Sequence, residues 1–108
     1  TLTHPILAET PDAVAAEEIS ASKRVLEEMT GQPVSLFAYP NGRPGRDYGE
    51  RHVVMVKDAG FRAAVSTRWA PAGRDSDPFQ LPRFTPWDLT PSRFLVRLVA
   101  NGFGLVRP

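Results

Sequence analysis

Histidine and cysteine, two side chains that often bind metals or take part in catalysis, are scarce in this sequence. It has no cysteine and two histidines. His4 directly precedes Pro5, and a residue before proline favours an extended or turn conformation. We therefore expect His4 in a loop, either as an ordinary surface residue or as one donor to a metal ion. His52 follows Arg51 in a predicted helix, where we expect it on the solvated side.

The segment LFAYPNG, from Leu36 to Gly42, is the other candidate for chemistry. The run Val34–Tyr39 is apolar and rich in residues that favour strands, so it predicts a buried strand. Pro40 lacks a backbone N–H and stops the strand, and Asn41-Gly42 tolerates the positive φ of a tight turn. In α/β proteins, sites form at the carboxyl ends of strands. Taken alone, the segment also fits a strand followed by an ordinary turn.

A long amphipathic helix is predicted before this strand, from Thr10 to Thr30. Thr10 can cap it, Pro11 suits the first helical position, and Gly31 fits just past the end. One face is apolar or small and is expected to pack on a sheet: Ala15, Ile19, Ser22, Val25, Leu26 and Met29.

Two more helices are predicted after the strand. The first begins at Asp47 or a neighbouring residue and runs to about Ala59, before Gly60. The second begins at 90–92 and ends before Gly102, with an apolar stripe made of Phe94, Leu95, Leu98 and Val99.

The remaining predicted strands are 61–66 and 79–84, the latter interrupted by Pro82 and therefore an edge or a strand end. Between them, 67–78 reads as a loop whose one anchor is Trp69. The alternation of helices and strands predicts an α/β fold with parallel strands. Three short parallel strands cannot cover both of their faces, so we expect the sheet to continue in sequence outside this chain or to pair with a second copy.

Composition limits the class of protein. The 108 residues allow one domain at most, and 42% hydrophobic with 23% charged residues is typical of a globular protein. With 13 basic and 12 acidic residues and no basic block, the chain gives no indication of a nucleic-acid partner. No apolar run is long enough for a membrane span. Thr1 is not an initiator methionine, so we expect the chain to be a piece of a longer protein.

Four segments in this order resemble the second half of the polysaccharide deacetylase family, the NodB-homology domain of carbohydrate esterase family 4. They are THP within TLTHPIL, FAYPNG, AGFRAAVSTR and LPRF. THP resembles the end of the family's histidine motif, and FAYPNG its proline motif in the branch that carries FAYP. The resemblance implies that residues 1–108 are a partial domain, the C-terminal half of a deformed (β/α) barrel that lacks its N-terminal strands.

The resemblance also implies an activity, the hydrolysis of N- or O-acetyl groups on a polysaccharide or oligosaccharide. The family's divalent metal, usually zinc, is held by one aspartate and two histidines, and His4 would be the second histidine. The backbone N–H after Pro40, on Asn41, would help to hold the oxyanion. Tyr39 and Trp69 would stack on sugar rings, although both could equally pack in the fold. Family members mostly act outside the cytoplasm, in the bacterial cell envelope.

The chain also departs from the family. The aspartates and the first histidine would lie upstream, Ala38 replaces the motif arginine of many members, and FLVRLVANGFG contains no histidine. Arg83 could replace that arginine, or it could be a rim residue bound to backbone carbonyls. Two hypotheses follow: part of a metal-dependent deacetylase that is inactive without the missing half of the barrel, or an inactive remnant that binds a sugar or a protein.

Overall fold

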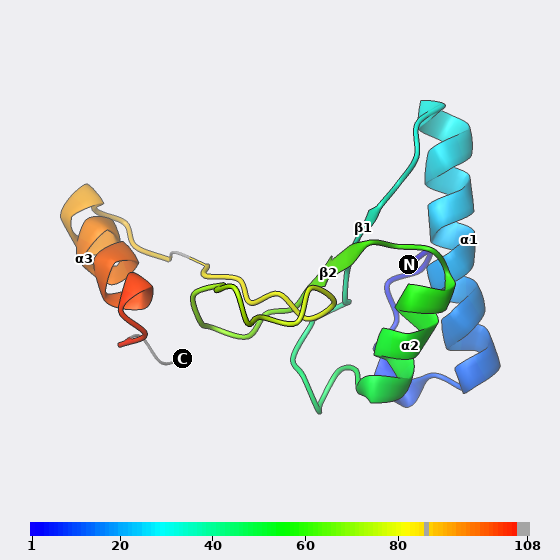
Figure 1. Ribbon diagram of the computed structural model, residues 1–108, viewed down its shortest axis with the longest axis horizontal. Coiled ribbons are helices and arrows are strands. Elements are labelled where there is room, and N and C mark those ends of the chain that lie inside the picture. Colours follow the sequence, from blue (N-terminus) through cyan, green and yellow to red (C-terminus); the bar gives the residue numbers. More distant parts are fainter. Residues whose placement is uncertain (86, 106–108) are drawn as a thin grey trace.

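The structure is a computed structural model that describes residues 1–85 and 87–105. Its elements are, in order, the 3-10 helix η1 (Leu7–Glu9), α1 (Asp12–Thr30), β1 (Leu36–Ala38), α2 (Glu50–Asp58), β2 (Ala63–Val65) and α3 (Pro91–Gly102). Helices α1 and α2 lie together at one end of the molecule, and α3 stands apart at the other end (Figure 1). The longest dimension is 43 Å.

Strands β1 and β2 pair in parallel, with Leu36 opposite Ala63 and Ala38 opposite Val65. Helix α2 forms the connection between them, as the order strand, helix, strand requires. The predicted α/β fold with parallel strands is confirmed. Both strands are shorter than predicted.

The segment predicted as a third strand, 79–84, forms only a single parallel bridge on the other side of β2. The Leu81 N–H donates to the Ala64 carbonyl at 2.9 Å, and the Ser66 N–H donates to the Leu81 carbonyl at 2.8 Å. Pro82 follows directly and has no N–H with which to continue the ladder. The strand prediction is therefore wrong in extent, although the segment lies where a third strand would.

The boundaries of α1 are close to those predicted. The helix ends at Thr30, and Gly31, at φ 65°, donates its N–H to the Glu27 carbonyl. Its start differs, because the N-cap is Pro11 and the Thr10 hydroxyl donates instead to the Ile6 carbonyl at 2.9 Å. Thr10 therefore closes the turn before the helix.

Helix α2 begins at Glu50 and not at Asp47 as predicted. Asp47 is buried in the preceding loop, where its Oδ2 accepts the Arg43 N–H at 2.9 Å. Its carbonyl accepts the Ala8 N–H at 2.9 Å. A side chain that satisfies loop amides competes with helix formation, so the helix starts three residues later.

The core contains a row of aromatic rings. Phe37 packs on Phe61 and, edge to face, on Tyr39, with centroids 5.2 and 5.3 Å apart. Tyr39 in turn stacks on Tyr48 at 3.7 Å. Leu7, in η1, is also fully buried in this core. The rings connect the inner face of β1 to the loop before α2.

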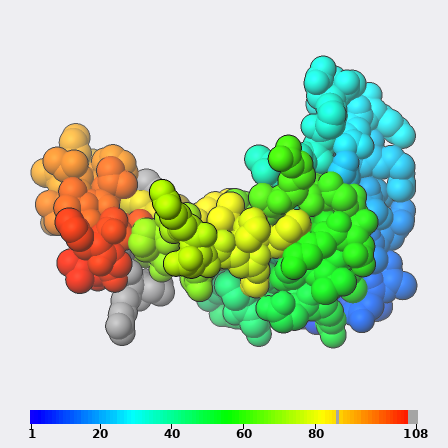
Figure 2. Space-filling model, viewed as in Figure 1, coloured from blue at the N-terminus to red at the C-terminus, as the bar shows by residue number. Residues whose placement is uncertain are grey.

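Two predicted apolar faces are only partly buried. On α1, Ala15, Ile19 and Ser22 are buried, whereas the continuation of the same face is exposed: Val25, Leu26 and Met29. On α3 the whole predicted stripe is exposed: Phe94, Leu95, Leu98 and Val99. The physical reason is that two short strands offer too little surface to cover these faces. Helix α3, in orange and red, also lies away from the blue and cyan α1 (Figure 2).

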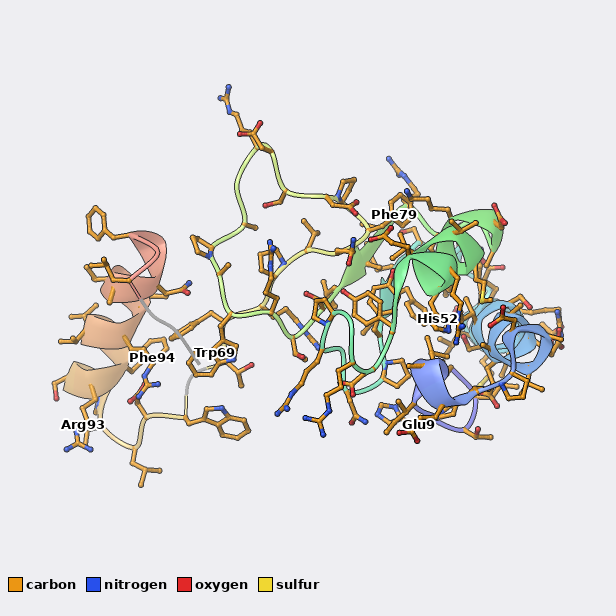
Figure 3. The ribbon with its side chains drawn as sticks, turned by 90° about the horizontal axis from the view of Figure 1, so that it is seen from below. Glu9, His52, Trp69, Phe79, Arg93 and Phe94 are labelled. Atoms are coloured by element: carbon orange, nitrogen blue, oxygen red, sulfur yellow. The ribbon has the colours of Figure 1, made fainter. Side chains whose placement is uncertain are left out.

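The prediction that His52 is solvated is wrong. Its side chain is 1% exposed and lies between α2 and the blue N-terminal elements (Figure 3). Its Nδ1 accepts the Gly49 N–H at 2.9 Å, which satisfies a free donor at the start of α2. Burial lowers the pKa of His52, and the nearby Arg51 charge lowers it further. The ring is therefore held neutral.

In the described part of the chain, no helix has the length and apolar character that crossing a lipid bilayer requires.

The burial of His52 predicts acid sensitivity. Because its pKa is lower in the folded than in the unfolded protein, the unfolded state binds a proton more readily. The free energy of unfolding should be highest above about pH 6.5 and should fall as the pH is lowered below it. Urea unfolding between pH 7.5 and 5 measures this. His52→Gln should flatten the dependence, and His4→Gln should retain it because His52 stays in place. If the free energy of unfolding depends on pH in the same way in both variants, His52 is not the cause of the acid sensitivity.

Candidate functional site

The turn after β1 reverses the chain within three residues. Pro40 is buried, and Asn41 and Gly42 have left-handed φ values of 57° and 78°. The Gly42 carbonyl accepts the Thr67 N–H at 2.8 Å, and the Asn41 carbonyl accepts the Thr67 hydroxyl at 2.9 Å. These bonds fix the turn to the residue that follows the end of β2 by two positions.

Backbone strain in the described residues coincides with the predicted site. His4, at φ 59°, and Asn41 are the only non-glycine residues there with positive φ. Such conformations cost free energy and gather at functional sites. Both residues are those that the motif resemblance assigned to chemistry.

The Asn41 backbone N–H has no hydrogen-bond acceptor among residues 1–85 and 87–105. Asn41 is exposed, and its neighbours on both sides are buried. A single N–H at a fixed, sharply turned strand end can donate to a bound oxygen atom with little reorganisation.

His4 is exposed in the loop before η1, as predicted. The described residues contain no group of three or more histidine, aspartate or glutamate side chains that could hold a metal ion. The donors present therefore do not make a metal site by themselves, and His4 could supply only one imidazole to it.

Glu18 of α1 holds the segment that leads to His4. Its Oε2 accepts the N–H groups of Leu2 at 2.8 Å and Thr3 at 2.9 Å, and its Oε1 accepts the Thr3 hydroxyl at 2.8 Å. The bonds from Thr3 lower the pKa of Glu18, so the carboxylate form is favoured. One side chain thus fixes the residue before His4 through both its backbone and its hydroxyl.

A groove of about 680 Å³ opens beside the turn. Its lining comes from the loops after β1 and β2 and from the segment before α3, and includes Asn41, Arg43, Thr67, Arg68, Trp69 and Trp87. This is the carboxyl edge of the parallel strands, where the sequence predicted a site. We call it the strand-end groove.

Trp69 lies on the side of its loop that faces α3 (Figure 3). It is half-buried, with Phe84 edge-on at 5.8 Å and the Arg97 guanidinium 5.9 Å from its ring centre. Arg97 also pairs with Asp88 at 2.9 Å. Trp69 thus packs in the loop and lines the groove at once, so both predicted roles remain open for it.

Tyr39 is not available as a sugar platform in this structure, which corrects that prediction. It is 2% exposed, stacked on Tyr48, and its hydroxyl donates to the Phe79 carbonyl at 2.9 Å. Burial raises the pKa of Tyr39 far above its usual value. As residues i and i+2 of one strand share a face, Tyr39 follows Phe37 into the core.

Arg83 is exposed on the segment that follows the Leu81 bridge, and it does not line the strand-end groove. Its Nε donates to the Ser66 carbonyl at 2.9 Å, the contact expected of a rim residue. Among the described residues it forms no ion pair with a carboxylate. Its role as a replacement for the missing arginine stays a prediction, because the carboxylate concerned would lie outside this chain.

Sequence reasoning missed four groove or support residues: Arg43, Arg68, Trp87 and Glu18. Trp87 is exposed and is preceded and followed by polar or turn-forming residues, which was a usable signal. The other three are charged residues in a loop or on a helix face, and such residues are ordinarily solvated.

The turn predicts a strong effect of Gly42→Ala. A Cβ there would lie 3.0 Å from the Tyr39 carbonyl oxygen and 3.1 Å from the Thr67 nitrogen, at a φ that alanine disfavours. The free energy of unfolding should fall by about 1–3 kcal/mol, measured by denaturant titration. Gly73→Ala is the matched control, since a Cβ there meets nothing within 4 Å. Equal stability of the two variants would show that the turn tolerates a side chain.

The Glu18 contacts predict that Glu18→Ala loosens the segment before His4. Hydrogen exchange at the Leu2 and Thr3 amides should accelerate roughly 10-fold, because their charged acceptor is lost. Glu17→Ala is the control, as Glu17 only pairs with Arg24 on the exposed surface. In the wild type the same protection should be lost as the pH falls through the lowered pKa of Glu18, below the range in which an ordinary glutamate titrates. Unchanged exchange rates at Leu2 and Thr3 in Glu18→Ala would show that Glu18 does not hold the segment before His4.

Comparison with known proteins places this geometry in a family. Residues 1–64 match the family model described as polysaccharide deacetylase. A comparison with curated proteins gives no match. Among solved structures, the Streptococcus pyogenes deacetylase PplD in complex with acetate is similar, with a TM-score of 0.76 and 22% identity. The match covers 87% of this chain and 40% of that chain, so this chain spans less than half of the length of PplD.

The structural likeness shows the fold, that of a deacetylase domain. The family match includes His4, the whole of β1 and the turn at Asn41. As the matched residues are more than half of the 108, the chain belongs to the polysaccharide deacetylase family.

Proposed function

We propose that this chain is part of a metal-dependent deacetylase that hydrolyses N- or O-acetyl groups of a polysaccharide. Residues 1–108 would be a partial domain, completed by the N-terminal half of the barrel or by a second copy. The proposal includes a location outside the bacterial cytoplasm, as in most of the family. The observation that carries it concerns Asn41, an exposed residue that follows the end of β1 and lines the strand-end groove, and whose N–H has no acceptor among the described residues.

Hydrolysis of an acetyl group requires that water add to the carbonyl carbon and lose a proton to a base, which would come from outside this chain. The carbonyl oxygen is then an oxyanion until the bond to the sugar nitrogen or oxygen breaks, and the sugar atom takes up a proton as acetate leaves. The Asn41 N–H has no competing acceptor in the described residues and can donate to that oxygen. Pro40 and Gly42, both buried, keep the donor in place. Trp69 and Trp87 give the groove apolar walls on which a sugar ring can stack.

His4 would supply one donor to the divalent ion, and the other donors would come from outside this chain. Zinc fits this role because imidazole nitrogen is one of its usual ligands. The bound ion would lower the pKa of a water molecule and polarise the acetyl carbonyl. Glu18 supports this role, because it fixes the segment before His4.

Acetate release from an N-acetylglucosamine oligomer by the full-length protein tests the proposal. His4→Ala should lower kcat/KM by at least about 100-fold, since even indirect metal partners contribute 10–100-fold. Glu28→Ala, on the exposed surface of α1, is the control.

A second pair of variants tests the main-chain donor. Asn41→Gly keeps the N–H and the left-handed φ, whereas the β-branched side chain of Asn41→Val opposes that φ. Asn41→Gly should therefore retain at least about 10-fold more activity than Asn41→Val. A full-length protein that binds the oligomer but releases no acetate would favour the inactive, sugar-binding alternative.

A further inference from the structure

The strand-end groove has an uneven distribution of charge. Two guanidinium groups line it, those of Arg43 and Arg68, and no carboxylate from the described residues does. The chain as a whole is nearly neutral, with 13 basic and 12 acidic residues. The excess of positive charge is therefore a local property of the groove.

Neither arginine is neutralised within the described residues. The ion pairs there involve other cations: Lys23, Arg24, Arg46, Arg51 and Arg97. Asp47, the acid nearest to Arg43 in sequence, accepts the Arg43 backbone N–H, and its other oxygen lies 4.0 Å from the Arg46 Nε. It is buried in its loop and does not line the groove.

The neighbouring hollows do contain acids. Arg43 also borders a hollow of about 320 Å³ with Glu9 and Asp47, and Arg68 also borders one of about 460 Å³ with Asp75 and Asp77. The strand-end groove shares Arg68 with one of these hollows and Arg43 with the other, but the only charged residues among its own described lining are these two arginines. Positive charge in a concave surface raises the local concentration of anions.

Arginine binds carboxylate and phosphate groups through paired hydrogen bonds. Trp69 and Trp87 in the same groove offer ring faces for sugars. We propose that the strand-end groove selects an acetylated glycan with anionic substituents, a carboxylate or a phosphate, which Arg43 and Arg68 bind. This inference rests on the proposed deacetylase function and names its substrate class.

The test uses the full-length protein and four oligomers of equal length. The first is neutral N-acetylglucosamine. The second alternates N-acetylglucosamine with N-acetylmuramic acid, which carries a carboxylate, and the third is the second after conversion of its carboxylates to neutral amides. The fourth is N-acetylglucosamine phosphorylated at O6. Acetate release gives kcat/KM, and titration calorimetry gives Kd, for each oligomer.

We expect kcat/KM and affinity to be roughly 10-fold or more higher for the carboxylate oligomer than for its amide form. The reason is that a hydrogen bond to a charged group contributes more binding free energy than one to a neutral group. The double variant Arg43→Gln/Arg68→Gln should bring that ratio close to one. The advantage should also shrink when salt is raised from about 0.05 to 0.5 M. Arg62→Gln is the matched control, because this exposed arginine lies at the opposite end of β2. If the ratio of the phosphate oligomer to neutral N-acetylglucosamine exceeds the ratio of the carboxylate oligomer to its amide form, the preferred anion is phosphate.

The outcomes separate the two proposals. Acetate release at equal rates from charged and neutral oligomers would overturn the anionic substrate class and leave the deacetylase function standing. An equal loss on all oligomers in the double variant would show that the arginines serve the reacting centre instead. No acetate release from any oligomer would refute the deacetylase function. In that case the ratio of Kd values still decides whether the groove selects anions.

Discussion

The contact between Gly42 and Thr67 is the constraint on which the site depends. The Thr67 N–H binds the Gly42 carbonyl, and the Thr67 hydroxyl binds that of Asn41. These bonds join the chain after β1 to the chain after β2, beyond the point where the strands stop pairing. Thr67 and the Tyr39 carbonyl lie so close to Gly42 that no Cβ fits there, and the φ of 78° also favours glycine. The same left-handed turn places Asn41 at the exposed end of the strand.

Aromatic packing beneath the turn makes this constraint rigid. Tyr39 lies one residue before Pro40, stacks on Tyr48 and binds the Phe79 carbonyl. The strand end is thereby fixed to the loop before α2 and to the segment that bridges to β2. A donor aimed at a reacting oxygen is most useful when it need not move, and buried rings with few rotamers provide that stability.

The apolar faces of two helices extend beyond what the small sheet covers. Helix α3 lies apart from α1 and α2 (Figures 1 and 2), and its Arg97 guanidinium lies 5.9 Å from the ring centre of Trp69. The apolar stripe of α3 is exposed. The face of α1 around Met29 is likewise exposed. Apolar helix faces are stable when a sheet or another helix covers them, and two strands cannot cover both. The PplD chain, of which this chain covers 40%, is longer and contains further structure beyond the matched part.

The sequence by itself determined the local features. The end of α1 at Gly31, the start of α3 at Pro91 and the turn after β1 follow from backbone rules for glycine and proline, which act within a few residues. The His4 and Asn41 positions were also readable, through motifs. Tertiary structure alone decided whether a side chain that is partly polar and partly apolar is buried or exposed. It buried Tyr39 and His52 and brought Arg43 and Arg68 to one groove, because these outcomes depend on contacts between segments distant in the chain.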